Sequence, residues 1–244
     1  MHYCIFLATT LSVIIGGIVR FVLALAAAVA SKVVPAVSRD YLEMASRYGM
    51  RDGQVFYIGT PPDRLESQPP AMAARDPGGP LRLVYIGGFG ASYDLATLGE
   101  AVRQGWRAAG GDGNEQPVEV HLAGYGEPPV WVRDGAGVVF HGMLGAAELR
   151  ALLERCHVGL NAVHGGSGIA MPNKVGDYLA AGLQLVHARE SGELAELVKE
   201  RGMGSCYRAG DVAGLVRAVG RYRGAAGGRQ VLGQGLRHLG RASR

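Results

Sequence analysis

The chain has 244 residues, of which 48% are hydrophobic and 19% are charged, and its formal net charge is +4. It is long enough for one large domain or two small ones, and its 39 glycines follow no collagen-like period. The small positive charge suits an anionic ligand or an anionic membrane surface, and it is too weak to indicate nucleic-acid binding.

The N-terminal segment is almost continuously apolar over residues 3–30, with Arg20 as the interruption. A run of this length can cross a bilayer as a helix. Basic residues follow the run and do not precede it, which does not fit a signal peptide. We therefore expect an apolar helix over residues 1–32. It either anchors a cytoplasmic chain to the inner face of the cell membrane, packs against a domain, or is the frayed remnant of a longer chain.

The next segment, residues 33–59, predicts a strand, a helix and a second strand. The strands are expected at residues 33–37 and 54–58, and the helix over residues 39–47 with Ser38 as its N-cap. Residues 60–80 are rich in proline, glycine and polar side chains, which predicts a linker or an exposed loop.

From residue 81 the chain alternates between apolar strands and amphipathic helices. The predicted strands are residues 81–86, 118–123, 137–140, 157–162, 183–188 and 205–208. We expect helices between them, with one starting near Asp94 and two others capped by Ser191 and Asp211. Tyr93 and Asp94 could contact a sugar or cap the first of these helices, and the cap is favoured. This alternation predicts an α/β fold, with a Rossmann-like parallel sheet covered by helices on both faces. The predicted domain spans residues 81–222, and residues 223–244 are a basic tail that we expect to be flexible.

The stretch from residue 171 to residue 182 is the most informative of the chain. Pro172 suits the first turn of a helix, and Gly182 suits the left-handed residue that closes one. Asn173, Lys174 and Asp177 would then lie near the positive end of that helix. Free N–H groups, a cation and a carboxylate at a helix start suit a sugar nucleotide. Lys174 could neutralise a diphosphate and Asp177 could bind a ribose diol, or both could be ordinary solvated charges.

Glycine-containing clusters follow the predicted strands at residues 87–90, 124–127, 141–144 and 164–168. In an open parallel sheet, ligands bind beyond the carboxyl ends of the strands, so these clusters should share one edge with residues 173–177. No nucleophile–base arrangement, paired carboxylates or metal-ligand spacing identifies a catalytic residue or a metal site. The three cysteines are far apart and form no CxxC pair, which favours a reducing compartment.

The order of these pieces resembles the C-terminal, donor-binding domain of GT-B retaining glycosyltransferases, the large family that includes sucrose-synthase-like enzymes and mannosyltransferases. The resemblance is carried by residues 81–90, 120–127, 141–149 and 172–182, and it covers about residues 81–222. Residues 38–59 resemble the segment that ends the family's N-terminal domain, so residues 33–59 are interpreted as a remnant of that domain.

The resemblance implies a UDP- or GDP-linked sugar as donor substrate, no metal or other cofactor, and transfer to a glycan or lipid-linked acceptor with retention of configuration. Its implied donor-binding residues fall into four groups: Gly87 and Gly88 at the diphosphate and sugar; Tyr125, Gly126, Gly142, Met143 and Leu144 near the base; Asn173 and Lys174 along the sugar and phosphates; and Asp177 at the ribose.

Two departures from the family pattern affect the expected chemistry. Ile169 stands where many members carry the first of two glutamates, and residues 91–94 lack the family's basic pair. Lys174 or another residue would have to supply the positive charge at the leaving diphosphate. About 80 residues precede the donor domain, which is short for the N-terminal domain of such an enzyme.

The resemblance as a whole leads us to expect a glycosyltransferase of polysaccharide or glycolipid synthesis. The alternatives are a truncated or split nucleotide-binding subunit that needs a partner chain for its acceptor domain, and another nucleotide-sugar enzyme such as an epimerase.

Overall fold

The structure, a computed structural model, describes residues 34–49, 52–55, 79–107, 116–164, 167 and 169–223. Internal contacts divide the chain into two units, residues 1–57 and 58–244. Within the described ranges, no helix is both long and apolar enough to cross a membrane. The predicted apolar helix over residues 1–32, most of the predicted linker and the predicted tail after residue 223 lie outside these ranges, so those boundaries stay predictions.

The first unit contains a parallel pair of short strands joined by a helix. Strands β1 (Val34–Ala36) and β2 (Gly53–Val55) pair in parallel, and helix α2 (Arg39–Arg47) connects them. The Ser38 hydroxyl accepts a hydrogen bond of 3.2 Å from the Tyr41 N–H, which caps the start of α2. The predicted order of strand, capped helix and strand is confirmed for this segment.

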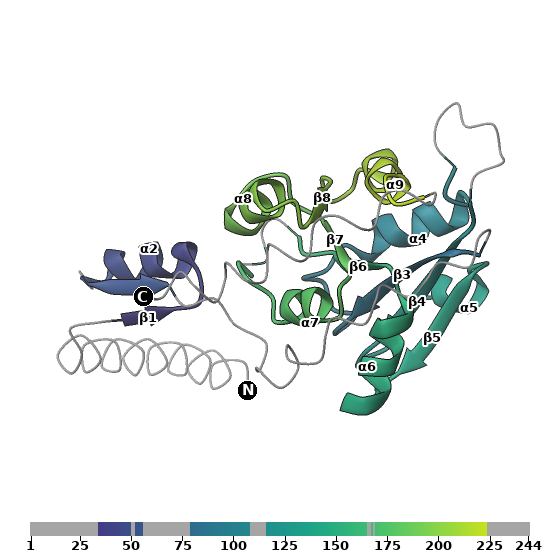
Figure 1. Cartoon of the computed structure of the whole chain (residues 1–244), viewed down its shortest axis with the longest axis horizontal. Helices are drawn as coiled ribbons and strands as arrows, with labels where there is room; N and C mark the ends of the chain where they lie inside the picture. Colours follow the sequence, from purple (N-terminus) through teal and green to yellow (C-terminus); the bar gives the residue numbers. More distant parts are fainter. Residues whose placement is uncertain are drawn as a thin grey trace, which may run out of the picture. The chain divides into compact units, whose positions relative to one another are not determined.

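The second unit is built on a six-stranded, fully parallel sheet with the order β5-β4-β3-β6-β7-β8 (Figure 1). Its strands are β3 (Leu81–Ile86), β4 (Val118–Ala123), β5 (Val138–Gly142), β6 (Val158–Asn161), β7 (Gln184–His187) and β8 (Gly204–Cys206). The chain starts in the middle at β3, moves outward to β5, then returns to β6 and continues in the other direction. The strand order therefore reverses between β3 and β6, which are direct neighbours.

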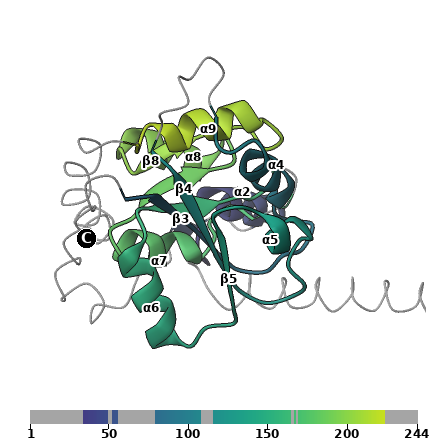
Figure 2. The same ribbon diagram turned by 90° about the vertical axis from the view of Figure 1, so that its right-hand side faces the viewer.

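Helices cover the sheet on both sides. They are α4 (Leu95–Arg103), α5 (Trp131–Asp134), α6 (Ala146–Arg155), α7 (Lys174–Ala180), α8 (Glu193–Glu200) and α9 (Val212–Gly220). Figure 2 shows α4 and α9 on one side of the sheet and α6 and α7 on the other. The predicted Rossmann-like parallel sheet with helices on both faces is confirmed. The sequence analysis missed α5, because four residues are too short for a helical period.

The main core lies between the sheet and helices α4 and α9. Alternate residues of β3 (Leu81, Leu83 and Tyr85) are fully buried there, and Leu98 and Leu215 pack against them from the two helices. On the opposite face, Gly159 of β6 makes room for a helix side chain. A Cβ atom at Gly159 would lie 2.4 Å from the ring of Tyr178 on α7. The absence of a side chain in β6 thus lets α7 pack directly on the sheet.

The helix ends show which predicted caps form. The Asp94 carboxylate accepts the Thr97 N–H in α4 and, with its other oxygen, the Gly210 N–H at 2.8 Å. Asp211 caps α9 in the same way through the Gly214 N–H. The predicted Ser191 cap is wrong. Gly192 occupies the N-cap of α8 with a φ of +94°, and no side chain caps this helix.

Helix α7 ends as its sequence predicts. Gly182 has a φ of +78°, the left-handed conformation that favours glycine. The Gly182 N–H donates to the Leu179 carbonyl, and the Leu183 N–H donates to the Tyr178 carbonyl. These two bonds form a Schellman motif, which satisfies carbonyl groups of the last turn. The turn leads the chain directly into β7, and this short connection fixes the end of α7 beside the start of β7.

Candidate functional site

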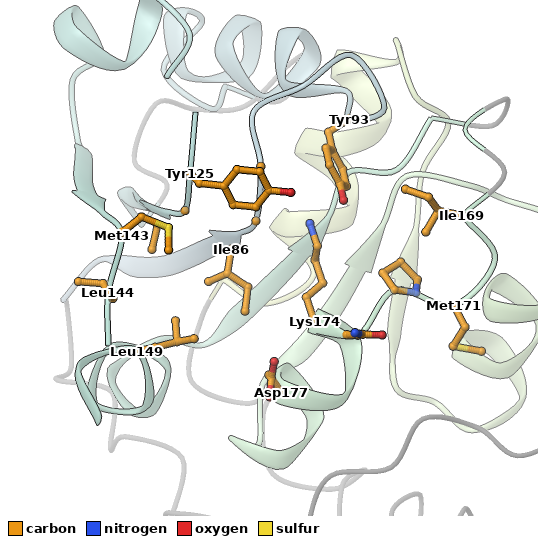
Figure 3. A pocket seen from close by; sticks show the side chains of 16 residues that line it. Ile86, Tyr93, Tyr125, Met143, Leu144, Leu149, Ile169, Met171, Lys174 and Asp177 are labelled. Carbon is orange, nitrogen blue, oxygen red and sulfur yellow. The ribbon is translucent and has the colours of Figure 1, made fainter. Parts of the chain in front are cut away.

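A cavity of about 520 Å³ opens beyond the carboxyl ends of β3, β4, β5 and β6. It lies where the strand order reverses, which is the usual ligand position in an open parallel sheet. Its size is within the range of small-molecule sites. The lining residues are Ile86, Gly87, Gly88, Tyr93, Ala123, Gly124, Tyr125, Met143, Leu144, Leu149, Ile169, Met171, Pro172, Asn173, Lys174 and Asp177 (Figure 3).

Two glycine turns bring the ends of β3 and β4 into close contact at this cavity. Gly87 and Gly124 have φ angles of +135° and +154°. A Cβ atom at Gly124 would lie 1.8 Å from the carbonyl oxygen of Gly87, so no side chain fits there. At Gly88, a Cβ atom would lie 3.0 Å from the Tyr125 ring. The backbone itself therefore forms this part of the cavity wall, and a ligand can approach it closely.

Two buried tyrosines hold the turn after β3. The Tyr178 hydroxyl accepts from the Ile86 N–H at 2.9 Å and donates to the Leu160 carbonyl at 3.2 Å. The Tyr85 hydroxyl donates to the Gly88 carbonyl at 2.5 Å. Burial raises the pKa of both phenols, so they remain protonated donors. The glycine turn is thus anchored from β3 and from α7 before any ligand arrives.

Lys174 is the most unusual side chain of the site. It extends from the start of α7 into the cavity and is only 8% exposed. Its Nζ lies 4.2 Å from the ring centre of Tyr85 and 4.1 Å from that of Tyr93. It has no hydrogen-bond partner among the described residues. Burial lowers the pKa of Lys174 to about 7, because a desolvated ammonium is costly without a counter-charge.

The position of Lys174 relative to Gly87 shows where an anion would meet this cation. A Cβ atom at Gly87 would lie 2.9 Å from the Lys174 Nζ, so the ammonium sits directly beside the glycine turn. Lys174 is also the one basic residue among the described residues that line the cavity. An anion placed against the glycine backbone would therefore touch the lysine, and it would supply the hydrogen-bond acceptor that Nζ lacks.

The predicted residues at the start of α7 reach the same cavity. Asp177 is half-buried in the first turn of α7 and lines the cavity with Lys174, as Figure 3 shows. Asn173 is exposed at the N-cap and also lines it. The expectation of free N–H groups at this helix start is wrong for Val175 and Gly176. Their N–H groups donate to the carbonyls of the two residues before the helix.

An apolar wall faces the cation across the cavity. Tyr125 and Met143 are 66% and 71% exposed, and Leu144 and Leu149 lie beside them. A flat or apolar ligand group can pack on such a wall while its charged part meets Lys174. Ile169, which stands where the family's first glutamate is expected, lines the opposite side of the cavity.

The structure thus brings eight of the ten predicted donor-binding residues to one cavity: Gly87, Gly88, Tyr125, Met143, Leu144, Asn173, Lys174 and Asp177. Gly126 and Gly142 do not line it; with φ angles of +95° and +66°, they turn the loops that carry their neighbours. The sequence leaves Tyr93 and Asp94 either to contact a sugar or to cap the helix, and it favours the cap. Asp94 makes that cap, and Tyr93 lines the cavity instead.

Other titratable groups serve the fold or stand apart from the cavity. The His157 Nδ1 accepts from the Arg82 N–H, and the His187 Nδ1 lies 3.1 Å from the Asn161 amide nitrogen. Cys156 is buried and Cys206 is half-buried, and both are free thiols. In the part of the chain that the structure describes, no group of three or more histidine, cysteine or acidic residues is arranged to hold a metal ion.

The fold and the position of the cavity define a class: a Rossmann-like domain of the kind that forms the C-terminal half of GT-B glycosyltransferases. The model of the family described as glycosyl transferases group 1 matches residues 80–223, which is more than half of the chain. The chain therefore belongs to the group 1 glycosyltransferases, and the resemblance seen in the sequence is confirmed.

Solved structures with the same fold include several sugar-transferring enzymes. The sucrose-phosphate synthase of Thermosynechococcus elongatus is 17% identical with a TM-score of 0.64, over 85% of this chain and 53% of that one. The apo form of the lipopolysaccharide outer core galactosyltransferase WaaB is 14% identical with a TM-score of 0.58, over 77% and 51%. The trehalose-phosphate synthase of Burkholderia vietnamiensis is 16% identical with a TM-score of 0.57, over 85% and 56%. The chain thus spans about half the length of these structures. No curated protein matches it.

Proposed function

We propose that this chain binds a UDP- or GDP-linked sugar and transfers the sugar to a polysaccharide or glycolipid acceptor with retention of configuration. The observation that carries the proposal is the buried Lys174 ammonium beside the Gly87 turn, in the cavity of a group 1 glycosyltransferase domain. A diphosphate seated against that turn would give the lysine its missing partner.

The cavity's two sides suit the two parts of such a donor. The base would pack on the apolar wall of Tyr125, Met143 and Leu144, and the ribose hydroxyls would bind the Asp177 carboxylate. The diphosphate would lie between Gly87 and Lys174. Negative charge grows on the leaving diphosphate as the sugar departs, so a fixed cation in a site of low polarity stabilises the transition state more than the ground state.

Lys174 would then replace the basic pair that is missing from residues 91–94. In this chain Tyr93 occupies that loop, and its ring packs against the lysine. The positive charge reaches the cavity from α7 instead of from the loop after β3. The sugar and the acceptor hydroxyl would meet on the open side of the cavity, and no described residue is assigned a covalent or acid–base role.

The experiment is calorimetric titration of the purified chain with UDP, GDP, UMP and GMP. We expect one diphosphate to bind and its monophosphate to bind more weakly. Lys174→Met should lower the affinity for the diphosphate by about tenfold to a hundredfold, which is the usual range for a lost charge-assisted hydrogen bond. Lys199→Met is the matched control, because Lys199 is exposed on α8 outside this cavity. Folded protein that binds neither diphosphate contradicts the proposal.

A second candidate function is a nucleotide-binding subunit that needs a partner chain for turnover. It is favoured by the site itself, because the described residues line a donor cavity and none of them is assigned a covalent or acid–base role. In that case the partner supplies the acceptor side, and the donor still binds here. Release of UDP or GDP from a nucleotide sugar by the purified chain, with or without added acceptor, would rule this candidate out.

A further inference from the structure

The edge strand β5 contains an irregularity directly before the apolar wall of the cavity. Leu122 of β4 pairs with Phe140, but the next residue, Ala123, pairs with Gly142. His141 is therefore an extra residue in β5, which is the pattern of a β-bulge. Gly142 follows with a φ of +66°, and its carbonyl accepts the Gly124 N–H at 2.8 Å. The bulge turns the chain toward the cavity.

The side chain of this extra residue makes a specific contact with the neighbouring strand. The His141 Nε2 lies 3.0 Å from the His121 Nδ1, and the two rings are nearly parallel, with 17° between their planes. His121 is 9% exposed. Its other nitrogen, Nε2, lies 3.4 Å from Glu119 Oε2, and Glu119 in turn pairs with Arg82 of β3 at 3.2 Å. A chain of side-chain contacts thus connects the bulge on β5 to β3 in the middle of the sheet.

This contact is lost only when both rings are charged. A hydrogen bond between two imidazoles needs one nitrogen with a hydrogen and one without. If both rings become charged, both facing nitrogens carry hydrogens, and two cations stand in contact. Burial lowers the pKa of both rings; Arg155 of α6 lowers the His141 pKa further, whereas Glu119 opposes the shift in both. The neutral pair is therefore the state near neutral pH.

We propose that the His121–His141 pair is a pH-sensitive latch that positions the loop of residues 142–144 on the nucleotide-binding cavity. With the latch closed, Met143 and Leu144 form the apolar wall. With both histidines protonated, the bulge separates from β4 and the wall shifts. This inference rests on the proposed function for the identity of the ligand, but the latch itself is a property of the free protein. His121 and His141 are positioning residues, because neither lines the cavity.

The first experiment follows the latch without any ligand. Protein with carbon-13-labelled methionine methyl groups is titrated by NMR from about pH 8 to about pH 4, well below ordinary histidine ionisation, because the pKa of both rings is lowered. The Met143 signal is assigned with Met143→Leu. In the wild type, we expect it to shift at the second, more acidic step of the two histidines' ring signals. In His141→Gln, whose amide can bond to His121 without titrating, we expect that shift to be lost.

The second experiment measures nucleotide affinity over the same range. Below the midpoint of the pair, the nucleotide affinity of the wild type should fall relative to that of His141→Gln. The expected fall is up to about tenfold per pH unit, which is the slope of a one-proton linkage. Protonation of the ligand's terminal phosphate is the same in each titration and cancels in this ratio. The control is His164→Gln, an exposed histidine that does not line the cavity.

The outcomes separate the two proposals. The latch is overturned if the Met143 shift persists unchanged in folded His141→Gln. It is also overturned if acid weakens nucleotide binding equally in the wild type and in His141→Gln. A Met143 shift that depends on the histidines, in protein that binds no nucleotide at any pH, supports the latch and contradicts the proposed function.

Discussion

Replacing Lys174 by methionine should make the protein more stable and the cavity less able to bind a nucleotide. The lysine is 8% exposed, and burial lowers its pKa from 10.5 to about 7. That lowering corresponds to about 5 kcal/mol of unfavourable burial for the charged form. Cation–π contacts with the rings of Tyr85 and Tyr93 offset about 2 kcal/mol of this cost. We therefore expect Lys174→Met to raise the free energy of unfolding by about 3 kcal/mol in mild acid.

The sign of the pH dependence follows from the direction of the shift. Below about pH 7 the lysine is protonated in both the folded and the unfolded protein, so the full cost is present. Above that pH the folded protein loses the proton first, and the wild type becomes more stable until the unfolded chain also deprotonates, near 10.5. The wild type gains about 1.4 kcal/mol per pH unit above about pH 7, so the advantage of Lys174→Met should fall to about zero at about pH 9.5.

The assay is urea unfolding of wild type, Lys174→Met and Lys199→Met at about pH 6 and about pH 9.5, the two sides of the transition. Lys199→Met removes the same charge from an exposed site and should change stability by less than about 0.5 kcal/mol at either pH. A Lys174→Met protein that is less stable than the wild type in mild acid would refute the reasoning. It would mean that the lysine is already satisfied in the free protein.

Three further predictions concern the walls of the cavity. Tyr178→Phe removes a hydroxyl that serves two buried backbone groups, so the free energy of unfolding should fall by about 1–3 kcal/mol, and an unchanged urea midpoint would contradict the anchoring role. Gly124→Ala forces a methyl group onto the Gly87 carbonyl and should cost about 3 kcal/mol or prevent folding. Gly90→Ala, with nothing within 4 Å of the added atom, should cost far less, and similar losses would show that crowding is not the cause. Asp177→Asn should abolish any preference for UDP over 2′-deoxy-UDP, and a variant that keeps the preference excludes Asp177 as the ribose ligand.

Local sequence patterns predicted most of the fold because each element depends on neighbours in the chain. Alternating apolar strands and amphipathic helices were sufficient for a parallel sheet, and the caps at Ser38, Asp94 and Asp211 form as predicted. The cap at Ser191 does not form, because the chain enters α8 through Gly192 in a conformation that a side chain would strain. Local capping rules cannot detect such an approach.

The candidate site was predictable in its location but not in its electrostatics. Glycines and polar residues after the strands indicated the correct edge of the sheet. The burial of Lys174 depends on Tyr85 and Tyr93, which come from a strand and a loop far from α7 in sequence. The His121–His141 contact likewise requires the register of two strands and an extra residue in one of them. Such pairings arise only from tertiary structure.

The adjacency of β3 and β6 also affects how this domain is made. Leu83 pairs with Val158 across a long stretch of intervening chain, so this contact closes a loop that contains the units of β4 and β5. A polypeptide emerging from the ribosome would contain its glycine turns well before the residues of α7 were synthesised. On the proposed function, products that end before α7 would lack Lys174 and Asp177 and would not retain the nucleotide.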